Sequence, residues 1–138
     1  MDPVEIIGRH YAPASKSHRI LLEHGRLVAE KALAAAARVT HLAPDLAFVE
    51  SAALLHDIGI FLTDSPTLDC YGREPYIRHG ILGREILEVL GLPRHGLVCE
   101  RHVGVGISAE DIRRFDLPLP VRDMCPVTVE EQIICYAD

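Results

Sequence analysis

The chain has 138 residues, which fits one domain with a sizeable hydrophobic core. Apolar residues make up 49% of it, and this fraction excludes an intrinsically disordered chain. The net charge of −6, with acidic and basic residues mixed along the chain, disfavours a protein that binds a nucleic-acid polymer through its phosphates.

The sequence predicts a cytoplasmic protein without membrane contact. Its first residues, MDPVEIIGRH, lack the basic start and apolar stretch of a signal peptide. Apolar stretches such as Leu46–Leu55 are shorter than the ~20 residues that span a bilayer. The four cysteines are widely spaced, so we expect reduced thiols and no cysteine-based zinc site.

The hydrophobic pattern predicts a single all-α domain over residues 1–138. Residues 1–14 contain two prolines and are expected to form an irregular lead-in. Apolar residues at three- and four-residue steps then predict a helix over 17–39 and another from Pro44 to near Gly59, where the glycine would end it.

The second half of the chain is predicted to alternate helices and loops. Residues 63–75, with two prolines and a glycine, are expected to form a loop near the substrate. Helices are expected over about 76–90, from Pro93 to Gly104, after the N-cap Ser108, and from the N-cap Thr128 to the C-terminus. Thr128 and Glu131 have the spacing of a capping box. The fold class is therefore an irregular helical bundle.

Five ionisable side chains lie on the apolar faces of different predicted helices. A buried polar group costs roughly 1–3 kcal/mol unless it is paired or coordinated. A pair of metal ions would be one partner shared by all five helices. These residues are His24, His56, His79, His102 and Asp138.

Imidazole and carboxylate ligands suit Fe, Mn, Co, Ni and Zn, because no thiolate restricts the choice. Adjacent helical residues differ by about 100° in direction, so His56 and Asp57 reach one cluster only if their helix ends there. Asp57 is then the natural bridge between two ions about 3.5–4 Å apart, which would activate a bridging water and bind the leaving oxygen of a phosphoester.

The order H…HD…H…H…D, with HDIG at residues 56–59, resembles the HD-domain superfamily of metal-dependent phosphohydrolases. The resemblance runs from about Leu21 to Asp138. Its segments ALLHDIG, RHGILGREIL, ERHVGVG and YAD are similar to small stand-alone HDIG proteins of archaea and bacteria.

The resemblance implies an HD-domain-like helical bundle with a binuclear metal site between helices. A first divalent ion would be bound by His24, His56, Asp57 and Asp138, and Asp57 would bridge to a second ion bound by His79 and His102. Fe or Mn is the expected metal, with Co, Ni, Zn or Mg as alternatives. No Gly-Tyr-Pro motif follows His102, which disfavours a cyclic-di-GMP phosphodiesterase.

Three arginines near the expected ligands are candidates for binding substrate phosphate, because a guanidinium matches phosphate oxygens bidentately. They are Arg73 in the loop, Arg78 beside His79 and Arg101 beside His102. The alternative is that Arg78 and Arg101 point sideways into ion pairs with Glu74 or Glu100.

The functional prediction is hydrolysis of a phosphoester or phosphoanhydride, on a small phosphorylated or nucleotide substrate. A metal-bridging hydroxide would attack phosphorus, with Asp57 as the catalytic residue that takes the proton of the water. Two alternatives stay open, because the same ligands serve each: a mixed-valent di-iron HD oxygenase, and a non-catalytic module that binds a nucleotide.

Overall fold

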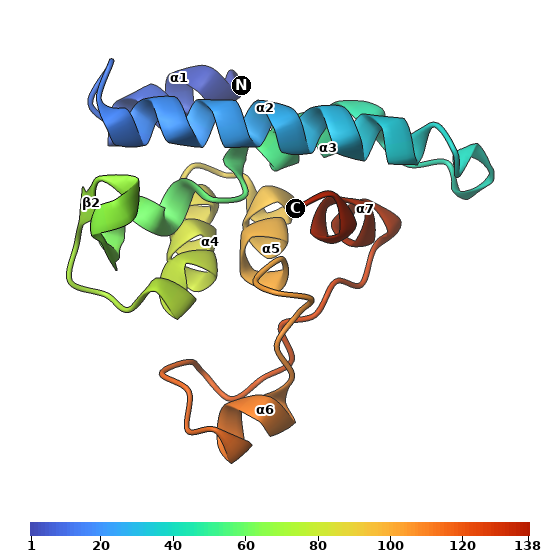
Figure 1. The fold of residues 1–138 in the computed structure, drawn as a ribbon. Coiled ribbons are helices and arrows are strands. Elements are labelled where there is room, and N and C mark those ends of the chain that lie inside the picture. The colour runs from blue at the N-terminus through green and yellow to red at the C-terminus, as the bar shows by residue number, and fades with distance from the viewer.

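A computed structural model describes residues 1–138 and contains seven α-helices. The long helix α2 lies along one side of the molecule with α1 and α3 beside it, and α4, α5 and α7 lie beneath this layer (Figure 1). The all-α prediction is confirmed. The helices are α1 (Pro3–His10), α2 (Lys16–Ala36), α3 (Leu46–Leu55), α4 (His79–Val89), α5 (Pro93–Arg101), α6 (Ala109–Arg114) and α7 (Val129–Ala137).

Several helices begin at side-chain caps, and two of these caps, Ser108 and Thr128, are the ones that the sequence predicts. Ser15, Ser108 and Thr128 each accept a hydrogen bond from a backbone N–H three residues on, at the starts of α2, α6 and α7. In a capping box the carboxylate of Glu131 would accept a hydrogen bond from the N–H of the N-cap, Thr128. Here it accepts instead from the N–H of Val127, one residue earlier. Each cap satisfies a donor that the first helical turn leaves free.

Residues 1–14 do not form the irregular lead-in that their prolines suggested. Asp2 caps a helix, α1, whose first residue is Pro3, where a missing N–H costs nothing. Ile6 and Ile7 of this helix are buried, as is Tyr11 just after it. The segment is therefore part of the core and forms one wall of the site described below.

The helix expected to run to Gly59 ends earlier, at Leu55. A short 3₁₀ turn, η2 (Ile58–Leu62), follows it. The expected loop at 63–75 contains a two-residue antiparallel ladder, in which β1 (Asp64–Ser65) pairs with β2 (Cys70–Tyr71), joined by a 3₁₀ turn η3 (Pro66–Leu68). Two further 3₁₀ turns are η1 (Thr40–Leu42) and η4 (Tyr76–Arg78).

The hydrophobic core consists of three clusters. One joins α2, α3 and α7 through residues such as Ala32, Val49 and Ile134. A second joins α1 to the region after α3, through Ile7 and Ile58, and a third packs the segment around α6 against α4. The helices therefore meet on several sides of the stretch after α3. None of them combines the length and apolar character that a membrane-crossing helix requires.

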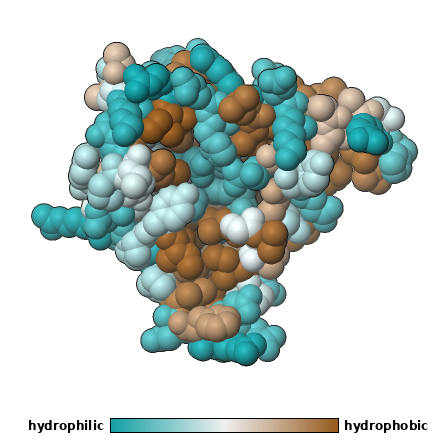
Figure 2. Space-filling model, viewed as in Figure 1, coloured by the Kyte–Doolittle hydropathy of each residue, from teal (hydrophilic) through white to brown (hydrophobic).

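The segment around α6 extends away from the other helices (Figure 1). A buried carboxylate links its base to the body. Glu100 of α5 is 3% exposed, forms an ion pair of 2.8 Å with Arg84 of α4, and contacts Arg122 of the segment. Figure 2 shows apolar surface between this segment and the upper helices, with hydrophilic residues around it.

Candidate metal centre

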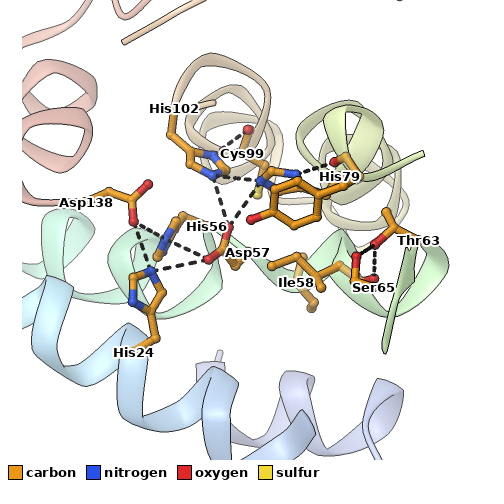
Figure 3. A network of polar contacts seen from close by, with 12 residues as sticks. His24, His56, Asp57, Ile58, Thr63, Ser65, His79, Cys99, His102 and Asp138 are labelled. Carbon is orange, nitrogen blue, oxygen red and sulfur yellow. Dashed lines mark hydrogen bonds and ion pairs between the residues drawn. The ribbon is translucent and has the colours of Figure 1, made fainter. Parts of the chain in front are cut away.

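Helix ends bring together the six residues expected to bind metal (Figure 3). His56 and Asp57 follow α3, His102 follows α5, and Asp138 follows α7. His79 begins α4, and only His24 lies inside a helix, α2. Helix C-termini carry partial negative charge, so three of them converging on one point favour a cation there.

Two glycines allow this approach. A Cβ at Gly59 would lie 2.2 Å from the carbonyl oxygen of His79, and one at Gly80 would lie 2.6 Å from the carbonyl oxygen of Cys99. Gly59 does not have a positive φ, so its role is close packing of η2 on α4 and not the helix termination expected from the sequence. This packing places the start of α4 beside Asp57.

The first group of donors surrounds one oxygen of Asp57. Asp57 Oδ2 lies 3.2 Å from His56 Nε2 and 3.3 Å from His24 Nε2. Asp138 Oδ1 lies 2.9 Å from His24 Nε2 and 3.3 Å from His56 Nε2. These four side chains therefore point their donor atoms at one another.

The second group surrounds the other oxygen of the same carboxylate. Asp57 Oδ1 lies 3.0 Å from His102 Nε2 and 3.4 Å from His79 Nε2, and the two Nε2 atoms are 3.2 Å apart. Both groups have the composition and spacing of a metal-ligand set, and Asp57 is common to them. The bridging position expected of Asp57 matches this division of its two oxygens.

Backbone carbonyls fix the orientation of three imidazoles. Nδ1 of His56, His79 and His102 donates to the carbonyl oxygen of the residue three positions earlier, at 2.5, 2.6 and 2.7 Å. For His56 and His102 these carbonyls belong to the last turn of a helix, where they lack helical partners. In the neutral ring Nε2 then carries a lone pair, which is the form that binds metal.

The cluster contains two carboxylates and no arginine or lysine, so it needs positive charge. Burial alone would lower the pKa of His56, but Asp57 and Asp138 raise it to about 10. Burial alone would raise the pKa of Asp57 and of Asp138, yet the surrounding imidazoles hold both below their ordinary values. A proton on His56 balances part of the carboxylate charge here, and a divalent cation can replace it.

The donor atoms also fit metal ions by distance. Two ligands on one ion, each about 2.0–2.1 Å from it, are themselves about 2.9–3.4 Å apart in octahedral or tetrahedral geometry. The separations between the imidazole nitrogens and the carboxylate oxygens, 2.9 to 3.4 Å, match this range. His56 Nε2 is buried without a hydrogen-bond partner, which a metal bond would provide. The residues present thus fit two divalent ions.

Two of the three candidate substrate arginines already have partners. Arg78 forms a 2.8 Å ion pair with Glu74 and donates to the carbonyl of Pro118, and Arg101 forms a 2.8 Å ion pair with Glu131. The sequence offered ion pairs with Glu74 or Glu100 as the alternative to substrate binding. Arg78 does pair with Glu74, but Arg101 pairs with Glu131 and not with Glu100. Arg73 is exposed and forms no ion pair. A role in substrate binding stays a prediction for all three.

A cavity of about 230 Å³ opens beside His24 and Asp57. Sequence reasoning missed most of its lining. Its apolar residues come from separate elements, and in the sequence they are indistinguishable from core residues. The only signal for Tyr11 was the Asp2–Pro3 pair, a helix start that places Tyr11 after α1. The cavity is lined by Tyr11, Ile20, Leu21, Ile60, Leu68 and Tyr76, among others.

Comparison with known proteins gives one family match, to the HD domain, over residues 21–138. An uncharacterised protein of Methanocaldococcus jannaschii is 37% identical over 121 residues, which is 86% of this chain and 64% of that protein. No solved structure matches the chain.

Two further relatives are tRNA (cytidine(56)-2'-O)-methyltransferases. The protein from Picrophilus torridus is 39% identical over 95 residues, and the one from Thermoplasma volcanium is 33% identical over 119 residues. The matches cover 68% and 86% of this chain but only 24% and 30% of the methyltransferases. This chain therefore corresponds to a minor part of each of these relatives.

Proposed function

We propose that this chain, which belongs to the HD domain family, is a phosphohydrolase that uses two divalent metal ions. The observation that carries the proposal is the division of Asp57 between two donor groups, one around each carboxylate oxygen. The first ion would be bound by His24, His56, Asp57 and Asp138, and the second by Asp57, His79 and His102. Fe or Mn suits this set of ligands.

When bound, the two ions would lower the pKa of a water molecule and stabilise negative charge on a phosphoryl group. The residues of the chain hold the donors in place. The carbonyls of Ala53, Tyr76 and Cys99 each accept a hydrogen bond from an Nδ1 atom, which directs three Nε2 atoms at Asp57 and leaves them able to bind the ions once any proton is displaced. Asp57 is ionised because its pKa is depressed, so it accepts a hydrogen bond from the attacking water and orients it.

We propose a small phosphoester as the substrate and not a nucleic-acid polymer. Two of the relatives are named as tRNA methyltransferases, but this chain matches no more than 30% of either one. The net charge of −6 supports the same choice, because binding a polyphosphate backbone requires an excess of Lys and Arg. The free guanidinium of Arg73 is the candidate for contact with the phosphate.

Hydrolysis of a panel of phosphoesters by protein loaded with Mn²⁺ or Fe²⁺ tests the proposal. We expect turnover that chelation abolishes and metal restores. Asp57→Asn should lose it, whereas Asp64→Asn, at an exposed carboxylate outside the cluster, should keep it.

Two results would contradict this function. Oxygen consumption that depends on substrate and on iron would indicate the di-iron oxygenase instead. Tight binding of phosphoesters without turnover, under every metal, would indicate the non-catalytic module.

A further inference from the structure

We propose that the substrate carries a single small apolar group, one ring or a short alkyl chain, which binds in the cavity beside His24 and Asp57. The inference rests on the proposed function, because the phosphoryl group of the same molecule would face the metal ions. It replaces the expectation of a nucleotide with a phosphomonoester whose organic part is small and uncharged.

The cavity belongs to the site because two of the six expected ligands, His24 and Asp57, form part of its wall. The rest of the wall is mainly apolar. Ile20 and Leu21 of α2 contribute to it, as do Ile60 of η2 and Leu68 of η3. A molecule bound through its phosphoryl group at the metal ions would place its organic part against these side chains.

The polar atoms of the wall offer little to a polar ligand. The hydroxyl of Tyr11 donates to the carbonyl of Ile58 at 2.9 Å and accepts from the N–H of Phe61 at 3.0 Å, so only its ring is available. The thiol of Cys70 donates to the carbonyl of Leu68. The hydroxyl of Ser17 shares a hydrogen bond of 3.2 Å with that of Ser15, so the hydroxyl of Tyr76 is the neutral polar group that remains. A sugar or a purine would leave most of its donors and acceptors unpaired here.

Charge excludes a polyphosphate from the same space. No lysine or arginine lines the cavity. Arg78 and Arg101, the nearest candidates in the sequence, are held by Glu74 and Glu131. A second or third phosphate beyond the one at the metals would have no cation to bind.

Volume sets the size of the apolar group. A dry cavity of about 150 Å³ holds benzene, and pockets for drug-sized ligands have about 300–1,000 Å³. The cavity of about 230 Å³ lies between these values. One ring or a chain of a few carbons fills it, whereas a nucleoside is too large to be enclosed in it.

Binding of phosphonates, which the hydrolase cannot cleave, tests the inference without turnover. Isothermal titration of Mn²⁺-loaded protein, without oxygen, compares methylphosphonate, phenylphosphonate and the phosphonate analogue of adenosine monophosphate, in which a methylene group replaces the ester oxygen. Because the phenyl ring is buried against apolar side chains, we expect it to bind at least about tenfold more tightly than the methyl compound. The adenosine phosphonate should bind no more tightly than methylphosphonate.

Ile20→Trp fills the cavity and should remove the phenyl advantage while methylphosphonate binding is kept. Leu27→Trp is the matched control, because Leu27 lies on the same helix and is 66% exposed. If Ile20→Trp fails to fold, Leu68→Trp makes the same test from the opposite segment.

Equal binding of methylphosphonate and phenylphosphonate, or tighter binding of the adenosine phosphonate, overturns the inference and leaves the proposed function intact. Binding of none of the three, by protein that holds its metal ions, overturns the proposed function and this inference with it.

Discussion

Asp57 and Glu100 are two of the three buried carboxylates in this molecule, and their surroundings differ. Glu100 lies between the guanidiniums of Arg84 and Arg122, which are charged at every physiological pH. Asp57 is surrounded by four imidazoles, and a second carboxylate, Asp138, adds to the negative charge. Glu100 thus has its countercharge within the chain, whereas Asp57 has it only if protons or cations are bound.

This difference separates a structural cluster from a functional one. A buried carboxylate with arginine partners connects helices and has no need of a ligand. Around Asp57, by contrast, imidazoles donate from Nδ1 to backbone carbonyls. When such a ring is neutral, its other nitrogen, Nε2, has a lone pair that can bind a cation. Such a cluster is stable with a cation and poorly balanced without one, so burial alone does not identify a site, but the type of partner does.

The largest expected effect on function is at Asp57. Asp57→Ala removes the one residue that both donor groups share, so we expect loss of both metal ions and a fall in activity on the order of 10²–10³ or more. Metal analysis and hydrolysis rates check this. Retention of one ion per chain would show that the groups bind independently.

Glu100→Ala should lower the stability of the protein without loss of metal, the opposite of the result expected for Asp57→Ala. It removes the buried carboxylate that both partly exposed guanidiniums contact, so we expect a loss of about 1.5–3 kcal/mol in the free energy of unfolding, with metal content unchanged. Urea denaturation measures it. The control is Glu88→Ala, whose exposed ion pair with Arg84 should be worth about 0.3–0.5 kcal/mol. A loss of metal in E100A would contradict the separation of the two clusters.

Gly59→Ala compares the two expected ion sites with each other. Its Cβ would clash with the carbonyl of His79, so α4 must shift, at a cost of about 1–3 kcal/mol. The second ion should be lost at lower chelator concentration than the first, because only His79 moves. Gly8→Ala is the control, since its Cβ meets nothing within 4 Å. Equal weakening of both ions would contradict the account.

The smallest expected effect is the pH dependence of the metal-free protein. The pKa of His56, raised to about 10, is above its ordinary value, so its contribution to stability is present below about pH 6.5 and is lost as pH rises toward 10. Thermal denaturation with chelator should give a falling Tm over this interval, and His56→Gln should fall less. With metal bound the fall should disappear, because the ion replaces the proton. A metal-free Tm that rises with pH over this interval would count against the charge balance described here.

The sequence predicted the parts of this account that depend on residue type and helical period. The apolar faces placed His24 and His79 on the sides of their helices that meet the cluster, and Ser108 and Thr128 mark helix starts where the structure has them. Two adjacent residues, such as His56 and Asp57, reach one cluster only where their helix ends. This condition led to the prediction that Asp57 lies between the two metal ions.

Other features depend on distances that no local pattern encodes. Gly59 reads as a helix terminator, although it is the proximity of His79 that requires a glycine. The prolines of residues 1–14 suggested an irregular chain. A proline breaks a helix in its interior but is tolerated at its first turn, and the sequence does not show which of the two positions Pro3 occupies. The apolar cavity was invisible for a similar reason, since Leu21 and Ile60 follow the same pattern as the core.

The most direct test of the central claim is the metal content of the chain, by elemental analysis of protein purified without air and without chelator. The two donor groups around Asp57 predict close to two Fe or Mn ions per chain in the wild type and one in His79→Ala. A wild-type value near zero that added metal does not raise would contradict the assignment of the cluster as a metal centre.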